Sequence, residues 1–302
     1  MRYVWILAAM AAGCGDKDTD TTPDDGDTGA ATDLFSEMVY VTEAPNGDFT
    51  GFENGFEGEW LTQEVDPDNQ VTVGMVGAVE DFETEDPVED PTVELFYGNA
   101  ITGTADQTME GDSDGQVSGE WPLCQPIAYR VTTDPDLDDT KVTLQFSEIA
   151  GFGKDASITF NSVSSATYQI IPSLLGVSPD PAKGVIAGTA YDIGGDAFSG
   201  AQVIVRDADG NIPEGIVAKY FRDDFPNRDQ EWTSEDGLWV IINVPVGDWD
   251  VEMYTADGGG GHVLMGTTQV AVVADSINIS SVYAGYGDGV VYPSSCLMDA
   301  GK

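Results

Sequence analysis

The sequence predicts an all-β protein with two tandem antiparallel β-sandwich domains after a signal peptide and a disordered acidic tether. From residue 34 onward, short runs rich in Val, Ile, Thr and aromatic residues alternate with Gly, Pro, Asp or Asn, which is typical of sandwich strands and their turns. A set of glycines, an Asp-Gly pair and a proline recurs after roughly 110 residues, which indicates two copies of one domain. The chain has 302 residues, enough for two domains of ordinary size.

The N-terminal residues carry a secretion signal. Arg2 precedes an apolar run at 3–12, and about ten residues are too few to span a bilayer but suit a signal-peptide core. The Ala-Ala-Gly-Cys at 11–14 then resembles the lipobox of bacterial lipoproteins, with Ala where Leu is usual. That resemblance implies cleavage before Cys14, acylation of Cys14 and, because Gly15 follows it, an outer-membrane location. The alternative is an ordinary secretory signal with an unrelated cysteine.

The segment 14–34 has the composition of a tether. After the cysteine it is dominated by Asp, Thr, Gly and Pro, and up to residue 33 it has no side chain suited to a core beyond Ala. Such a segment cannot bury enough apolar surface to offset its ordering entropy, so we expect disorder. Its alternating Asp residues could indicate a calcium loop, but the Gly and closing Glu of an EF-hand are not at their positions. We expect a solvated spacer between a lipid anchor and a folded body.

The charge balance is strongly acidic. Lys and Arg total 11 against 54 Asp and Glu, which gives a formal net charge of -43. Such a charge repels nucleic acid and anionic lipid headgroups. We therefore expect contact with the membrane through the lipid anchor alone. The charge also attracts divalent cations loosely.

The cysteine count predicts one disulfide. If Cys14 is acylated, Cys124 and Cys296 remain, an even number in an oxidising compartment. A bond between them would pin the Gly-rich C-terminal tail onto the first sandwich. The alternative is two unpaired thiols, since no second Cys pair or His cluster accompanies them to form a zinc site.

The two proposed copies align through their turn residues, with one residue of slippage between the two glycines that begin each copy. The second copy has the clearer pattern, and the first, at about 70–150, matches it loosely and has Cys124 and Gln125 where the second has a Gly after its Pro. The matched positions are Gly74 with Gly184, Gly77 with Gly188, Gly115 with Gly237, and Pro122 with Pro245.

The motif of the second copy resembles the carboxypeptidase regulatory-like domain. The resemblance lies in Gly-x-Ile-x-Gly at 184–188, Gly-Ala-x-Val-x-Val at 200–205, and Thr-x-x-Asp-Gly-x-Trp followed by Val-Pro-x-Gly-x-Trp-x-Val at 233–251. It implies a seven-stranded sandwich of transthyretin or starch-binding-like type, a carbohydrate-binding-like fold. It also implies a non-catalytic module, of the kind appended to peptidases, surface adhesins and outer-membrane receptors.

Helical spacing, a Ser start and a closing Gly at 165–176 predict a short helical turn before the linker that ends at 182. The expected organisation, in chain order, is a lipoprotein signal peptide at 1–13, the tether at 14–34, the first, divergent sandwich at 35–164, the helical turn and linker at 165–182, the carboxypeptidase regulatory-like sandwich at 183–285, and a C-terminal tail at 286–302.

The stretch at 233–254 reads as a pair of sandwich strands between two tight turns. Asp236-Gly237 suits a turn with positive φ, and Pro245 with Gly247 suits the next. The apolar alternation then places Trp239 and Trp249 in the core. The alternative is an aromatic shelf for a ligand.

Little in the sequence indicates catalysis. His262, the single histidine, follows four glycines in what we expect to be a hairpin tip, without the Lys-Ser/Thr and helix of a phosphate loop. A Ser-His-Asp or Cys-His arrangement could form only through this loop residue. A glycosidase needs two carboxylates in a cleft, and two small sandwiches offer little cleft. We expect a protein that is not an enzyme and has no cofactor, apart from possible calcium.

The insertion at 211–232 is the first candidate binding feature. Aromatic and Arg residues on a long loop are frequent anchors of interfaces. The alternative is an insertion that packs on its own sandwich and pairs with nearby acids. Its candidate residues are Lys219, Tyr220, Phe221, Arg222, Phe225, Arg228 and Trp232.

Two further features are weaker candidates. Acidic sandwich loops can hold Ca²⁺ through carboxylate and backbone oxygens, or can simply be solvated. Aromatic side chains on a Gly-rich segment at 46–60 can form a sugar-stacking face, or can cover a sandwich edge. The candidate calcium residues are Asp134, Asp136, Asp138 and Asp139, and the candidate sugar-face residues are Phe52, Phe56 and Trp60.

The sequence therefore predicts a cell-envelope lipoprotein of the outer membrane, periplasmic or surface-facing, that displays sandwich modules for protein interaction or adhesion. Two alternatives remain open. One is a polysaccharide-binding surface lipoprotein, which needs coplanar, solvent-facing aromatic rings. The other is an inert structural spacer of the envelope.

Overall fold

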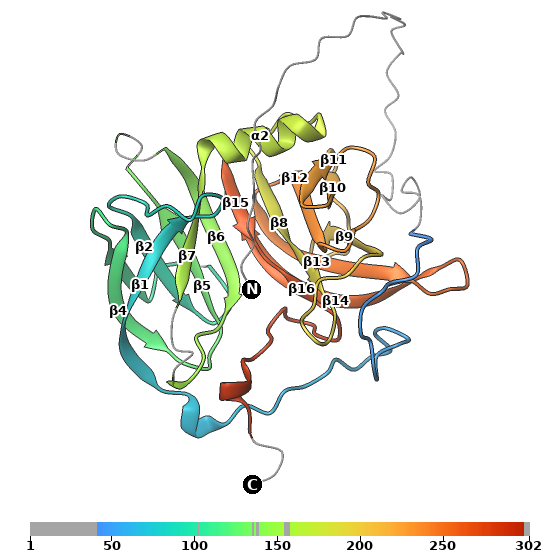
Figure 1. Ribbon diagram of the computed structural model, residues 1–302, viewed down its shortest axis with the longest axis horizontal. Helices are drawn as coiled ribbons and strands as arrows, with labels where there is room; N and C mark the ends of the chain where they lie inside the picture. Colours follow the sequence, from blue (N-terminus) through green and yellow to red (C-terminus); the bar gives the residue numbers. More distant parts are fainter. Residues whose placement is uncertain (1–40, 102, 135, 137–138, 154–157, 299–302) are drawn as a thin grey trace, which may run out of the picture.

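The computed structural model describes residues 41–101, 103–134, 136, 139–153 and 158–298. The predicted signal peptide and tether, Cys14 included, lie outside the described residues, as does Asp138. Within the described part the chain is mostly strand, with a single α-helix, α2 (Ser165–Leu175). Figure 1 shows two strand-built bodies side by side with α2 across one end. The predicted all-β sandwich class is confirmed.

The first sandwich packs two sheets around an aromatic centre. Its strands are β1 (Thr72–Asp81), β2 (Thr92–Tyr97), β3 (Gln107–Glu110), β4 (Gln116–Pro122), β5 (Ile127–Thr132), β6 (Thr140–Glu148) and β7 (Thr159–Ser164). One sheet has the order β4-β1-β7 and the other β3-β2-β5-β6, and β7 also reaches β6 at one end. Between the sheets, the Phe160 ring stacks on Trp121 at 5.0 Å and meets the edge of Tyr129 at 4.8 Å.

The second sandwich repeats this plan. Its strands are β8 (Gly184–Tyr191), β9 (Ala201–Arg206), β10 (Val217–Arg222), β11 (Phe225–Asn227), β12 (Leu238–Val244), β13 (Gly247–Ala256), β14 (His262–Val272), β15 (Ser276–Ile279) and β16 (Val282–Tyr283). One sheet has the order β11-β10-β12-β8-β15, with β16 also beside β8, and the facing sheet is β14-β13-β9. Trp239 is buried between the sheets, as predicted, and Trp249 is partly buried against the same core.

The two sandwiches are joined through a sheet and a core. β15 lies between β8 of the second sandwich and β6 of the first and runs parallel to both. One sheet therefore runs β11-β10-β12-β8-β15-β6-β5-β2-β3 through the molecule. On the first-sandwich side, Phe96, Leu144 and Phe146 belong to the same buried cluster as Ile186 and Val251 of the second. Shared hydrogen bonds and shared apolar burial make the pair one packed unit.

Helix α2 covers the outer face of this sheet where the sandwiches meet. It begins at the N-cap Ser164, whose hydroxyl accepts from the Thr167 N–H at 3.2 Å, and it ends at Gly176, whose φ of +77° suits a left-handed C-cap. Its apolar side chains Tyr168 and Leu175 pack against strand residues of the second sandwich such as Val240. The segment expected as a helical turn and linker thus contains a helix that packs onto both sandwiches.

The two sandwiches share a pattern of strand pairing. β1 pairs with β4 antiparallel and with β7 parallel, as β8 pairs with β12 and β15. The turn glycines are equivalent too, because Val79 donates to Gly115 O at 2.8 Å and Ala190 donates to Gly237 O at the same distance. A bulge at Asn243, with φ of +66°, adds one residue to β12. That extra residue makes the stretch from Gly237 to Pro245 one residue longer than the stretch from Gly115 to Pro122.

Segments from both ends of the chain lie along the second sandwich. The N-terminal strap, residues 41–71, contacts it before the chain enters the first sandwich, with Asp48 N–H donating to Asp192 Oδ2 at 2.7 Å. The C-terminal strap, residues 284–298, runs along the free edge of β14, with Gly285 N–H donating to Met265 O at 2.7 Å. Covering that edge removes unpaired backbone groups that could pair with another chain. In the described part of the chain, no helix has the length and apolarity to cross a membrane.

Candidate functional site

The predicted binding insertion is a packed hairpin, β10–β11. Tyr220 is 2% exposed and its hydroxyl accepts from the Val203 N–H at 3.0 Å, while the next residue, Phe221, is buried beneath α2. Consecutive aromatic side chains are both buried because β10 has the sandwich interior on one face and α2 on the other. Neither ring is available to a partner in this structure.

The basic side chains of the hairpin form hydrogen bonds with the hairpin itself and with the end of α2. Lys219 Nζ donates to Arg228 O at 3.0 Å, and Arg222 Nη2 donates to Gln230 Oε1 at 2.5 Å. Arg228 Nε donates to Leu174 O at 2.7 Å, so this cation satisfies a carbonyl at the end of α2.

Two aromatic side chains of the insertion differ in their surroundings. Trp232 Nε1 donates to Glu43 Oε2 in the N-terminal strap at 2.7 Å. Phe225 is 55% exposed and is the large apolar side chain that the hairpin presents to solvent. The hairpin therefore offers one exposed ring rather than a cluster of anchors.

The predicted sugar face is a stack of rings. Trp60 lies 4.3 Å from Phe56 and 5.9 Å from Phe52 between ring centroids, with interplanar angles of 20° and 22°. Phe52 is 6% exposed and Phe56 37%. Trp60 packs closely against Gly287 of the C-terminal strap. These rings cover the second sandwich and face one another, instead of lying side by side toward solvent.

The acidic loop after β5 forms local hydrogen bonds. Asp134 accepts from the Asp136 N–H at 3.0 Å, and Asp139 accepts from the Ser165 hydroxyl at 2.7 Å at the start of α2. In the part of the chain that the structure describes, no group of three or more His, Cys, Asp or Glu is placed to hold a metal ion. His262 begins β14, and its ring meets Tyr254 edge-on at 5.3 Å.

A groove lies where the two sandwiches meet. Its volume is about 270 Å³. One wall is the loop after β2 together with Phe146 of β6, and the other comes from β13, β14 and the loop after β9. The lining residues are Asn99, Ala100, Ile101, Phe146, Ala208, Asp248, Trp249, Asp250, Gln269, Val270 and Ala271.

The polar side chains of the groove are held in place. Trp249 Nε1 donates to Pro245 O at 2.8 Å, which fixes the indole. Gln269 Nε2 donates to Asp250 Oδ1 at 2.9 Å across the β13–β14 pair. Asn99 Nδ2 donates to Ser147 Oγ at 2.8 Å. Among these residues the sequence pointed only to Trp249, as a core residue, because the walls come from segments about 150 positions apart.

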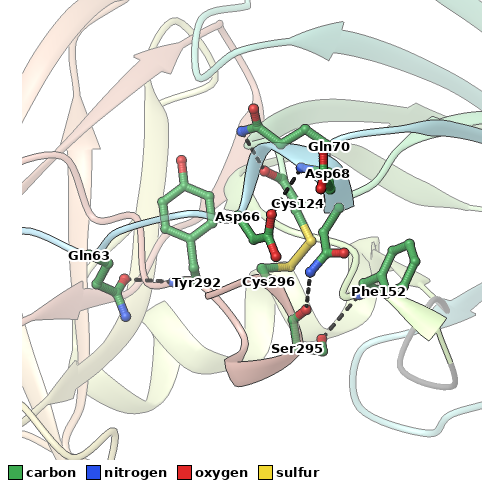
Figure 2. Close-up of a disulfide and its surroundings, with 10 residues drawn as sticks. Gln63, Asp66, Asp68, Gln70, Cys124, Phe152, Tyr292, Ser295 and Cys296 are labelled. Atoms are coloured by element: carbon green, nitrogen blue, oxygen red, sulfur yellow. Dashed lines mark hydrogen bonds between the residues drawn. A yellow bond between two sulfur atoms is a disulfide. The ribbon is translucent and has the colours of Figure 1, made fainter. Parts of the chain in front are cut away.

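The predicted disulfide is present. Cys124 and Cys296 are bonded, fully buried, and 5.3 Å apart at Cα. Figure 2 shows the bond between the two straps, close to Phe152. Ser295 Oγ accepts from the Phe152 N–H at 3.1 Å, and Asn69 Nδ2 donates to Ser295 O at 3.0 Å. The bond therefore ties the C-terminal strap to the turn between β4 and β5, as expected from the cysteine count.

A polar network sits beside the core of the first sandwich. Asn161 N–H donates to Tyr129 Oη at 2.9 Å, and the Tyr129 hydroxyl donates to Gln145 Oε1 at 2.6 Å. The Gln145 amide in turn donates to Glu148. Burial raises the pKa of Glu148, and the Gln145 hydrogen bond offsets part of that rise. Burial, then the charge of Glu148, raise the pKa of Tyr129 well above its usual range.

The E148Q variant is expected to be more stable than the wild type at neutral pH. A carboxyl whose folded-state pKa is raised favours folding below its unfolded pKa, near 4.5, and loses that contribution as pH rises through the folded value. The variant cannot ionise, so its advantage should vanish at pH 4. Urea unfolding at pH 4 and pH 7 measures this, with Glu83→Gln as an equal charge change outside the network. An equal advantage at both pH values would contradict the assignment.

Comparisons with known proteins give distant structural likenesses. No family model matches the sequence, and no curated protein matches it. The Bacillus anthracis TIE protein is similar at 12% identity and a TM-score of 0.24, over 71% of this chain and 34% of that chain.

Pilins of Gram-positive bacteria are also similar at this level. The shaft pilin SpaA of Lactobacillus rhamnosus GG has 9% identity and a TM-score of 0.23 over 73% of this chain and 100% of the pilin. The minor pilin GBS52 of Streptococcus agalactiae has 10% identity and a TM-score of 0.23, over 73% and 98%. Likeness at these values carries no inference about the function of this chain.

Proposed function

We propose that this chain is a non-catalytic lipoprotein of the cell envelope that displays two fused β-sandwiches for interaction with a protein partner. The observation that carries the proposal is the buried Cys124–Cys296 bond. It uses the two cysteines that remain when Cys14 is acylated, and disulfides of this kind persist in oxidising compartments. The lipobox-like segment at 11–14 and the acidic segment after it supply the anchor and the spacer.

The architecture supports display rather than catalysis. The shared sheet and the shared core join the sandwiches into one packed unit, and packed scaffolds of this kind position binding surfaces. The resemblance of 184–251 to the carboxypeptidase regulatory-like domain supports a non-catalytic, appended type of module. The aromatic side chains at 52, 56 and 60 and the hairpin β10–β11 mostly serve packing, so we assign the partner to the groove between the sandwiches.

Membrane fractionation of the Cys14→Ala variant tests the anchor. The wild-type chain should sediment with membranes, and the variant should appear in the soluble fraction, because acyl chains supply the affinity for the bilayer. Gly15→Ala keeps the cysteine and serves as the control that stays membrane-bound. Equal sedimentation of all three chains would overturn the lipoprotein assignment.

A further inference from the structure

The groove between the sandwiches joins an apolar floor to an acidic rim. Ile101 and Phe146 of the first sandwich face Trp249 and Val270 of the second across it. Asp248, an exposed carboxylate, lies on the rim. A ligand seated here would contact both sandwiches at once.

The charged residues that line the groove are both acidic. Asp248 and Asp250 lie two residues apart on β13, so their side chains share one face of the strand about 7 Å apart. No Lys or Arg is among the residues that line the groove, and none of the ion pairs found within the described residues uses either carboxylate. Asp250 already accepts a hydrogen bond from Gln269 Nε2 and lies opposite Arg206 of β9, which pairs with Glu252. The exposed Asp248 is therefore the more accessible of the two carboxylates for a cation from outside the chain.

The charge of the whole chain reinforces this local pattern. A formal net charge of -43 produces a field that concentrates cations and repels anions. An anionic ligand is disfavoured on both counts. A neutral saccharide would gain nothing from the field, and the Trp249 N–H that could have bonded a sugar hydroxyl is already donated to Pro245.

We propose that this groove binds Lys or Arg side chains from a basic segment of a partner protein. The inference rests on the proposed function, in which the chain binds a protein, and it names the site and the chemistry of the partner. Long basic side chains have an apolar stem and a cationic head. The stem fits against Ile101, Phe146 and Val270, and the head reaches Asp248 and Asp250. The Trp249 indole adds cation–π attraction where the ring is exposed.

Binding of short synthetic peptides to the purified full chain tests the proposal. One peptide carries Lys and Arg residues between glycines, and a second has Gln in their place. The basic peptide should bind, the Gln peptide should not, and affinity should fall as salt is raised because the contact is ionic. Neutral oligosaccharides are titrated under the same conditions.

Three variants locate the site. The D248N/D250N variant should weaken basic-peptide binding by about tenfold, because both ionic contacts are lost. The D86N/D229N variant removes the same charge from carboxylates that do not line the groove and should bind nearly as the wild type does. A208W keeps both carboxylates but fills the groove and should also weaken binding. Far-ultraviolet circular dichroism checks that each variant is folded.

Several results would overturn the proposal. Equal losses in the two charge variants would show general electrostatic attraction without a site. Salt-insensitive binding of an oligosaccharide that A208W abolishes would assign the groove to sugars instead. No binding of the basic peptide would also reject it. None of these results depends on the acylation of Cys14, so failure here leaves the fractionation test of the anchor standing.

Discussion

Replacing Cys124 and Cys296 together with serine is expected to lower the free energy of unfolding by up to about 5 kcal/mol. The bond spans a sequence separation of 172, and a cross-link that closes a long loop removes much entropy from the unfolded chain. Both sulfurs are buried, so the two serine hydroxyls would also need hydrogen-bond partners that a disulfide does not require. The loss should release the C-terminal strap before the rest of the fold.

Guanidinium unfolding of the oxidised wild type, the reduced wild type and the C124S/C296S variant measures this effect. The reduced wild type and the variant should unfold at similar, lower denaturant concentrations. Hydrogen exchange should show early loss of protection at the β14 edge, because the C-terminal strap that covers this edge is no longer held by the disulfide. An unchanged midpoint in the variant would show that the strap is held by its noncovalent contacts alone.

Glycine-to-alanine substitutions in β1 and β8 are expected to lower the free energy of unfolding by different amounts. A Cβ at Gly188 would overlap the backbone carbonyl of Ser280. The Ser280 backbone cannot move away freely, because its N–H donates to β8. We expect a loss of about 3 kcal/mol for G188A. At the equivalent Gly77 the nearest atoms are Ile158 O at 3.1 Å and the Phe160 ring at 3.2 Å, so G77A should cost about 1 kcal/mol.

Gly74 provides the matched control for this series. It lies on the same strand as Gly77, and an added Cβ there would meet no heavy atom within 4 Å, so G74A should be neutral or slightly stabilising. Urea unfolding of the three single variants ranks them. Equal effects at Gly74 and Gly188 would mean that strand propensity, and not close backbone approach, sets the cost.

The strands with the clearest alternation were predictable from the sequence, and those with mixed character were not. β13 alternates apolar and polar residues, and β12 is a continuous apolar run, and both lie between tight turns, which identify strands without tertiary information. β10 was missed because its sequence, Val-Ala-Lys-Tyr-Phe-Arg, shows no alternation. Its burial on both faces depends on α2, a distant element. That tertiary contact also explains why Tyr220 and Phe221 are core residues and not interface anchors.

The sites also divide into those that local sequence features predict and those that depend on tertiary contacts. The disulfide could be expected because the parity of the cysteines and the compartment limit the choices to one pair. The groove could not, because it exists only where Ile101 and Trp249 are brought together by the pairing of β15 with β6. The stacking of Phe52 and Phe56 on Trp60 likewise depends on where the N-terminal strap lies, which no local pattern specifies.

The placement of the two straps has a consequence for the order of folding as the chain is synthesised. The N-terminal strap is synthesised before the residues that it contacts. Asp48 bonds to Asp192, Leu61 to Gly285, and Val65 pairs with Leu297. Contacts of such long sequence separation form slowly. The first sandwich can assemble early, but the shared sheet, the covered β14 edge and the disulfide are completed only once the C-terminal residues emerge. A chain truncated before Cys296 would lack the disulfide and would leave Cys124 as a free thiol.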